Sequence, residues 1–162
     1  KRQKRTILDH FAFPFIAKIP RGSALGRGVF LIQNDSELRD YLDQVTPAYI
    51  QEYLPIQQDI RVVVIGNRII HAYWRIAPPN EYRSNLAFGG RVSLDNVPDA
   101  ARDLALQVAQ ACRWDDVGID ICEHNGRFYV LEANMKYGKE GFRKAGLDYH
   151  RLMESMIANE EI

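Results

Sequence analysis

The amino-acid sequence predicts an α+β fold with mainly antiparallel sheets. Two observations support this class: strand-like and helical segments are interspersed along the chain, and two pairs of strand-like segments are joined by turns short enough for β-hairpins. The chain has 162 residues, of which 46% are hydrophobic and 26% charged, as in an ordinary globular protein. It is long enough to bury a core in one domain or in two small lobes.

The first predicted elements surround a glycine-rich segment. Residues 11–20, FAFPFIAKIP, are apolar apart from Lys18, and Val29–Gln33 form a second apolar run, so both are expected to be strands. ELRDYLDQV, residues 37–45, has apolar residues at helical spacing. It is preceded by residues that cap helices well, Asn34, Asp35 and Ser36. AYIQEYLP, residues 48–55, predicts another short strand.

Two hairpins and two helices are expected in the remainder of the chain. Two β-branched runs flank Gly66 and Asn67 in DIRVVVIGNRIIHAYWR, a pattern typical of a hairpin. PPNEYRSNLAFGGRVS, residues 78–93, is too irregular for a helix or a strand and is expected to be a loop. The pattern of VPDAARDLALQVAQAC predicts an amphipathic helix. VGIDIC and RFYVLEAN predict the second hairpin, and LDYHRLMESMIANEEI predicts the last helix.

RGSALGRG, residues 21–28, is a candidate phosphate-binding loop. P-loops and dinucleotide-binding loops lead into a helix, whereas a predicted strand follows the last glycine here, which excludes both. A glycine-rich hairpin can instead place backbone N–H groups over a polyphosphate, with Lys18 adding a positive charge. The alternative is a simple hairpin tip, with Lys18 on a solvent-facing side.

Acidic residues interrupt the apolar strands of the second hairpin. Asp120 lies between two isoleucines, and Glu132 and Asn134 follow FYVL. Buried carboxylates require a cation, and two carboxylates with an amide oxygen form a hard oxygen site suited to Mg²⁺ or Mn²⁺. The alternative is an exposed polar strand face.

The length of the second turn decides whether these groups share a face. A two-residue turn at Asn125–Gly126 places residue 120 opposite residue 131 and turns Glu132 to the other face. A three-residue loop, 124–126, places residue 120 opposite residue 130 and leaves Glu132 on the same face as Asp120.

A third candidate cluster lies in QEYLPIQQDIR. Glu52 and its neighbours could offer backbone groups to a purine, and Asp59 a carboxylate to ribose hydroxyls. Arg61 is equally consistent with a structural ion pair and with catalysis. A two-residue turn at Gly66–Asn67 puts Asp59 and Arg61 on one face and Arg75 on the other, unless a bulge intervenes.

The composition of the chain indicates which classes of binding partner and which cellular compartment to expect. The formal net charge is zero, so nothing global points to a nucleic acid. Cys112 and Cys122 form no CxxC pair, which suggests a reducing compartment. No apolar run approaches the roughly 18 to 20 residues of a membrane helix. We therefore expect a cytoplasmic protein that binds neither nucleic acid nor membrane; homo-oligomer formation is left open.

The order of the motifs along the chain resembles the ATP-grasp superfamily. The motifs are the strand lysine, the glycine hairpin, QEYL, DIR, RSN, the aspartate of GID and the ExN of LEAN. The greatest similarity is to the RimK-like ligases that add glutamate to ribosomal protein or to small amine acceptors. The resemblance implies an ATP-grasp fold whose two lobes, here residues 1–48 and 49–162, hold nucleotide between them. It also implies a carboxylate–amine ligase using ATP and Mg²⁺ or Mn²⁺: ATP phosphorylates a carboxylate, and an amine acceptor, a small molecule or a protein terminus, attacks the acyl phosphate.

The resemblance also implies roles for single residues. Residues expected to contact the nucleotide are Lys18, Gly22, Ser23, Gly26, Gly28, Glu52, Tyr53, Asp59, Arg83, Ser84 and Asn85. Those expected to act in catalysis are Arg75, Arg83 and Asn85, with Arg75 clamping the acyl phosphate. The expected metal ligands are Asp120, Glu132 and Asn134.

Two segments depart from the family pattern. Ala87 and Phe88 stand where a basic pair is usual, and residues 135–137, MKY, replace a small residue and proline, so acceptor recognition is expected to differ. The family's ligases carry a separate N-terminal domain, which we expect this chain to lack and without which we expect little turnover. The alternative function is a module that binds Mg-nucleotide without ligase turnover.

Overall fold

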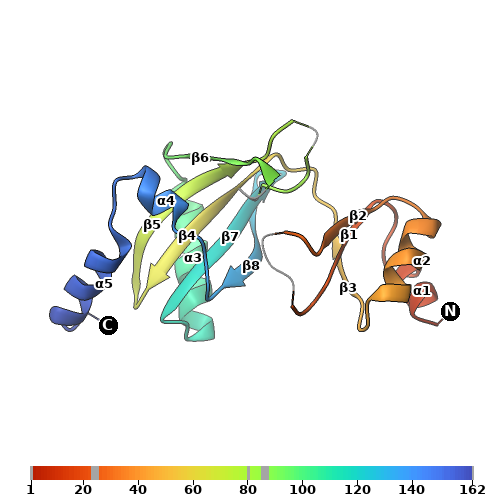
Figure 1. The fold of residues 1–162 in the computed structure, drawn as a ribbon, viewed down its shortest axis with the longest axis horizontal. Coiled ribbons are helices and arrows are strands. Elements are labelled where there is room, and N and C mark those ends of the chain that lie inside the picture. Colours follow the sequence, from red (N-terminus) through yellow and green to blue (C-terminus); the bar gives the residue numbers. More distant parts are fainter. Residues whose placement is uncertain (1, 23–25, 80, 85–87, 162) are drawn as a thin grey trace. The chain divides into compact units, whose positions relative to one another are not determined.

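The computed structural model describes residues 2–22, 26–79, 81–84 and 88–161. The chain divides into two compact units, Lys1–Pro55 and Ile56–Ile162, here called unit 1 and unit 2 (Figure 1). The division falls after Pro55 rather than at the predicted position after residue 48. The reason is that the strand beginning at Tyr49 pairs with the first strand of unit 1 and belongs to its sheet.

Unit 1 is a small antiparallel sheet with two helices. Its elements are α1 (Arg2–Leu8), β1 (Phe15–Lys18), β2 (Val29–Ile32), α2 (Asp35–Gln44) and β3 (Tyr49–Glu52), and the strand order is β2-β1-β3. The Asn34 side chain caps α2 by accepting hydrogen bonds from the backbone N–H groups of Ser36 and Glu37, both 3.0 Å. Because side chains alternate along a strand, Phe15 and Ala17 enter the core while Lys18 lies on the other face.

Unit 2 is a five-stranded antiparallel sheet with helices on both faces. Its elements are β4 (Gln58–Ile65), β5 (Arg68–Ile76), β6 (Arg91–Ser93), α3 (Asp99–Cys112), β7 (Asp116–His124), β8 (Arg127–Asn134), α4 (Glu140–Lys144) and α5 (Tyr149–Ala158), and the strand order is β6-β5-β4-β7-β8. Helix α3 covers one face (Figure 1), where Ile60, Val62 and Val64 pack with the alanines of the helix. On the other face, Val63 and Ile65 pack with Phe142 of α4 and Met156 of α5.

Several elements differ from the sequence-based expectation. The strand expected over residues 11–20 is confined to Phe15–Lys18, and the expected loop 78–93 ends in the short edge strand β6. Helices α1 and α4 were not expected, because each is short; α1 is held by Ile7 in the unit 1 core and by an ion pair of 2.5 Å between Lys4 and Asp35. Within the described part of the chain, no helix has the length and apolar character to cross a membrane.

The first hairpin of unit 2 combines a two-residue turn with a bulge. Ile65 lies opposite Arg68 across the turn, and the register shifts between Val63 and Val64. The shift inserts an extra residue on β5, so that Asp59 lies opposite Arg75 and both side chains reach the same face. The bulge that the sequence left open is therefore present.

The second hairpin is built in the same way. His124 lies opposite Arg127 across Asn125 and Gly126, whose φ angles of 52° and 73° favour this pair of residues. The register then shifts between Asp120 and Ile121, which brings Asp120 directly opposite Glu132. Both predicted registers are therefore wrong in detail, because neither included a bulge, although Glu132 does share the face of Asp120.

Candidate functional site

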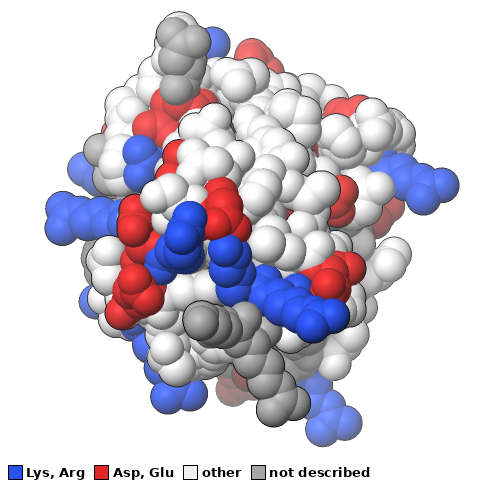
Figure 2. Space-filling model, turned by 90° about the vertical axis from the view of Figure 1, so that its right-hand side faces the viewer, with Lys and Arg blue, Asp and Glu red and all other residues white. Residues whose placement is uncertain are grey.

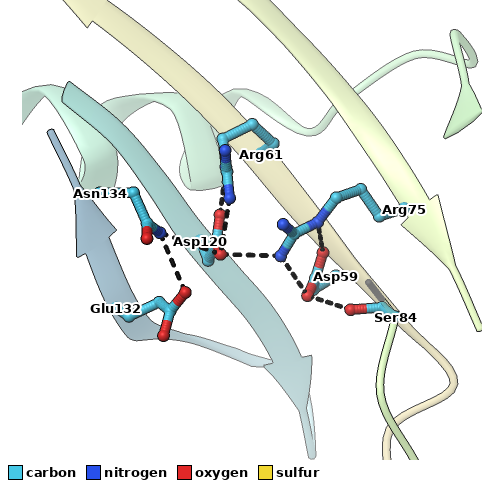
Figure 3. Close-up of polar contacts among 7 residues, drawn as sticks. All are labelled: Asp59, Arg61, Arg75, Ser84, Asp120, Glu132 and Asn134. Carbon is cyan, nitrogen blue, oxygen red and sulfur yellow. Dashed lines mark hydrogen bonds and ion pairs between the residues drawn. The ribbon is translucent and has the colours of Figure 1, made fainter. Parts of the chain in front are cut away.

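Four charged side chains are buried in the middle of the unit 2 sheet, on the face turned away from α3 (Figure 3). The exposed fractions are 3% for Asp59, 5% for Arg61, 7% for Arg75 and 2% for Asp120. Ions this deeply buried persist only when they are paired. With two carboxylates and two guanidinium groups, the cluster is formally neutral.

Arg75 joins the two carboxylates. Its Nε and Nη2 atoms donate to the two oxygens of Asp59, each at 2.7 Å, and Nη2 lies 2.8 Å from Oδ2 of Asp120. Ser84 donates a hydrogen bond from its hydroxyl to Oδ2 of Asp59, which connects the segment after β5 to the cluster. Among the described residues, nothing accepts a hydrogen bond from Nη1 of Arg75.

Asp120 is held from a second side by Arg61, which lies opposite it on β4. The Nε and Nη2 atoms of Arg61 donate to Oδ1 and Oδ2 of Asp120, the latter at 2.9 Å. This bidentate geometry fixes the orientation of both groups. Arg61 therefore belongs to the cluster, and its place there could have been found from the sequence only with the correct strand register.

Burial and charge act on these groups in opposite directions. Burial raises the pKa of Asp59 and the nearby Asp120 carboxylate adds to this, so its pKa lies above the ordinary value in spite of Arg75. Burial acts the same way on Asp120, but the attraction of Arg75 and Arg61 outweighs it and lowers the pKa. Burial would lower the pKa of Arg75, yet the two carboxylates outweigh it and raise the pKa, so the guanidinium remains charged.

Glu132 and Asn134 extend the cluster toward solvent (Figure 3). Nδ2 of Asn134 donates to Oε1 of Glu132 at 3.0 Å and more weakly to Oδ2 of Asp120 at 3.4 Å. Among the described residues, no group of three or more His, Cys, Asp or Glu side chains is arranged to hold a metal ion. The predicted set of two carboxylates and one amide is nevertheless brought together, and its donor atoms are of the hard type that Mg²⁺ prefers.

Arg83 pairs with a carboxylate outside this cluster. Its guanidinium makes a bidentate pair with Glu81, at 2.9 and 2.8 Å, and lies 3.5 Å from the centre of the Phe88 ring. The hydrogen bonds from Arg83 lower the pKa of Glu81 and stabilise its charged form. Glu81 was not predicted from the sequence. Asn85, predicted as a partner of Arg83, lies outside the described residues.

The remaining predicted nucleotide contacts lie in unit 1. Lys18, at the end of β1, has its Nζ 5.7 Å from the centre of the Tyr49 ring. Gly22 and Gly26 both have positive φ angles, 72° and 76°, a conformation that favours glycine, whereas Ser23 lies outside the described residues. The carbonyl of Gly28 accepts a hydrogen bond of 2.8 Å from Ile19, which closes the base of the loop. Glu52 ends β3, and Tyr53 follows it.

Unit 1 also contains a pocket of about 740 Å³ that includes none of the predicted site residues. It is lined by Phe30 and Ile32 of β2 and by Tyr41 and Val45 at α2, together with neighbouring residues. Phe30 pairs with Ala17, so the pocket adjoins the core-facing side of the sheet, opposite to Lys18. On the face shown in Figure 2, basic and acidic side chains are interspersed. Within unit 1, Asp35 forms ion pairs with Lys4 and Arg39.

A family model described as a RimK-like ATP-grasp domain matches residues 1–157. Among curated relatives, a probable α-L-glutamate ligase 2 of Shewanella frigidimarina is 33% identical over 138 residues, covering 82% of this chain and 46% of the relative. A ribosomal protein bS6–L-glutamate ligase of Escherichia coli is 33% identical over 142 residues, covering 83% and 47%. The chain thus spans about half the length of these relatives.

Solved structures support the fold. D-alanine–D-alanine ligase from Bacillus anthracis superposes with a TM-score of 0.69 at 18% identity, covering 95% of this chain and 56% of that one. The ATP-grasp ligase PsnB, complexed with a variant of its minimal precursor, Mg and ADP, gives a TM-score of 0.69 at 21% identity, covering 96% and 49%. The predicted α+β class with antiparallel sheets and the predicted ATP-grasp fold are confirmed.

Proposed function

This chain belongs to the RimK-like ATP-grasp family, and on this premise we propose that it is the ATP-binding part of a ligase that joins a carboxylate to an amine. In the proposed reaction, ATP phosphorylates the carboxylate and leaves as ADP, and the amine attacks the acyl phosphate to form an amide bond and release phosphate. Glutamate is the proposed amino-acid substrate, since both curated relatives are named as L-glutamate ligases. The observation that carries the proposal is the buried Asp59–Arg75–Asp120–Arg61 cluster beside Glu132 and Asn134.

Arg75 is the proposed clamp for the transferring phosphoryl group. Its orientation is preset by Asp59 and Asp120, so little reorganisation is needed when negative charge develops nearby. Nη1 donates to no described residue and is proposed to contact an acceptor on the substrate. A guanidinium with both carboxylates attached stays protonated at any physiological pH, because those carboxylates raise its pKa.

Asp120, Glu132 and Asn134 are the proposed ligands of Mg²⁺ or Mn²⁺. The ion, when bound, supplies positive charge that offsets the charge of the nucleotide phosphates. An amide presents nitrogen to a carboxylate and oxygen to a cation, so a half-turn of the Asn134 amide exchanges the two roles. Glu132 is exposed and lacks a guanidinium partner among the described residues, which leaves its carboxylate available.

Nucleotide contacts are proposed for each unit separately. In unit 1, Lys18 and the segment 22–28 are proposed to contact the phosphates, and Glu52 and Tyr53 the adenine. In unit 2, Asp59, Ser84 and Arg83 are proposed to contact the nucleotide, and Asn85 is included from the sequence pattern alone. The hydrogen bond from Ser84 to Asp59 supports a shared role for these two residues.

Thermal unfolding with and without Mg-ATP tests the proposal without knowledge of the acceptor. Ligand at 100 times its dissociation constant is expected to add about 2.7 kcal/mol and to raise Tm by roughly 5 to 10 °C. The shift should require Mg²⁺ and should be reduced in Glu132→Gln. The matched control is Glu123→Gln, an exposed glutamate on β7, which should behave like the unchanged protein. Absence of any nucleotide-dependent shift would contradict the proposal.

The second candidate, a nucleotide-binding module without turnover, is favoured by the residues that follow Asn134. Tyr137 belongs to the segment 135–137 that departs from the family pattern, and it is buried over Gly118. The two functions are separated by ADP release in the presence of a supplied carboxylic acid and a supplied amine, one of them L-glutamate. Release that requires both compounds supports the ligase, and nucleotide binding without such release supports the module.

A further inference from the structure

The ammonium group of Lys139 is enclosed by aromatic rings. Its Nζ lies 3.6 Å from the centre of the Tyr137 ring and 3.2 Å from that of Tyr149, with Phe142 further away at 5.9 Å. Such contacts attract a cation to the ring faces and limit the positions it can take. The lysine is therefore held more firmly than an ordinary surface lysine.

Asp116 fixes the two tyrosines. The hydroxyl groups of Tyr137 and Tyr149 donate to different oxygens of Asp116, at 2.6 and 3.1 Å. The two rings stand edge to face, with an interplanar angle of 90° and centroids 6.3 Å apart. The Asp116 oxygens thus accept hydrogen bonds from the tyrosines, and burial outweighs the attraction of Asp116 and lowers the pKa of Lys139.

The Lys139 ammonium attracts the Asp116 carboxylate but forms no ion pair or hydrogen bond with any described residue. No carboxylate oxygen of these residues lies within the 4.0 Å that defines an ion pair, and none of their hydrogen-bond acceptors is in reach of Nζ. An ammonium has three N–H donors, and the ring faces of Tyr137 and Tyr149 do not replace a charged acceptor. The described residues therefore leave the N–H groups of this ammonium without an acceptor.

This lysine lies beside the candidate site. A Cβ atom on Gly118 would come within 2.9 Å of the Tyr137 ring and 3.1 Å of Cδ of Arg61, so both side chains pack over this glycine. Gly118 also lies opposite Asn134 in the sheet. Burial and, to a smaller extent, the Arg61 charge lower the pKa of Lys139, against the opposite effect of Asp116. The aromatic cage thus borders the end of the cluster that contains Arg61, Asp120 and Asn134.

We propose that Lys139 binds a carboxylate of the amino-acid substrate that is not itself activated, and so selects a dicarboxylic amino acid such as glutamate. This inference rests on the proposed ligase function and names the residue that recognises the substrate. A single caged ammonium suits one carboxylate, whereas a polyphosphate requires several cations or backbone N–H groups. Either carboxylate of glutamate could be the one bound, and the experiment distinguishes them.

The test is calorimetric titration of L-glutamate into protein saturated with Mg²⁺ and the ATP analogue AMPPNP. Lys139→Gln is expected to weaken glutamate binding by about tenfold or more, as for the loss of one charge-assisted hydrogen bond. Lys136→Gln is the matched control, because Lys136 is an exposed lysine of the same segment. L-glutamine and L-isoglutamine lack one carboxylate each. One of these analogues lacks the carboxylate that Lys139 binds. That analogue should bind the unchanged protein more weakly than L-glutamate does, and it should bind Lys139→Gln with the same affinity as the unchanged protein.

Three results would overturn the inference. The first is equal glutamate affinity in Lys139→Gln and in the unchanged protein, and the second is an equal loss of AMPPNP affinity in the variant, which would place the lysine at the phosphates. The third is that the protein binds AMPPNP but no glutamate. This result would contradict the inference about Lys139 without contradicting the proposed nucleotide site. Failure of AMPPNP to bind the unchanged protein is the separate outcome that overturns the proposed function and this inference with it.

Discussion

Asp59 and Arg75 lie directly opposite each other on β4 and β5, and the guanidinium donates two hydrogen bonds of 2.7 Å to the carboxylate. The pair exists because a bulge shifts the register of the hairpin by one residue. Since Arg75 also contacts Asp120, one side chain neutralises two buried carboxylates. Stability and proposed catalysis therefore depend on the same contacts.

Replacing Arg75 by leucine is expected to destabilise unit 2 strongly. The change leaves the Asp59 carboxylate buried without its cation, a situation that costs about 3 to 5 kcal/mol. Urea unfolding followed by circular dichroism measures the loss. Arg91→Leu, at an exposed position of β6, should change the free energy of unfolding by no more than about 0.5 kcal/mol. Similar effects for both variants would show that the buried cluster contributes little.

Asp120→Asn is expected to lower stability as well as nucleotide binding. The substitution removes the charge that two guanidinium groups share, leaving Arg61 and Arg75 close together in a buried site. We expect a loss of about 3 kcal/mol or more in the free energy of unfolding. Asp103→Asn, on the exposed side of α3, is the control. An Asp120→Asn protein as stable as this control would mean that the pairing is not needed for folding.

Gly141→Ala tests the close packing of α4 on the sheet. A Cβ atom at this position would lie 2.2 Å from the Tyr73 ring, which is itself buried, so the helix or the ring must move. Overpacking of this kind costs about 1 to 3 kcal/mol. Gly138→Ala has open space around the added methyl group and should have no such cost. Equal thermal unfolding temperatures for the two variants would contradict the observed packing.

His71 is expected to make the stability depend on pH. Burial lowers its pKa below the ordinary value of 6.5, in spite of a hydrogen bond of 3.1 Å with the Gly141 carbonyl. The unfolded chain then binds a proton more readily than the folded one, so stability is full above pH 6.5 and falls as the pH drops toward the folded pKa.

Urea unfolding at pH 7.5 and 5.5 measures this effect. The unchanged protein should lose stability on acidification, and His71→Phe should lose less. His150→Gln, at an exposed position of α5, should retain the full pH dependence. If the pH dependence of stability were unchanged in His71→Phe, it would have to come from other titratable groups.

Much of the fold could be predicted from local patterns. The strand–helix–strand order of unit 1, the two hairpins of unit 2 and the helices α2, α3 and α5 follow from hydrophobic periodicity and from turn residues such as Asn125 and Gly126. The short elements α1, α4 and β6 carry too few residues for a periodic signal, and they are held by packing or by sheet pairing instead.

The candidate site shows the same division. The sequence by itself determined which carboxylates, guanidinium groups and glycines are available, and their order along the chain was sufficient for the family resemblance. Only the tertiary structure decided that Asp59 meets Arg75, that Asp120 faces Glu132, and that Lys139 lies between two tyrosine rings. The physical reason is that successive side chains of a strand point to opposite faces of the sheet. A single bulge therefore changes the cross-strand partner of every residue beyond it. Such a bulge leaves no local mark in the sequence, and it is fixed by the packing of the whole sheet.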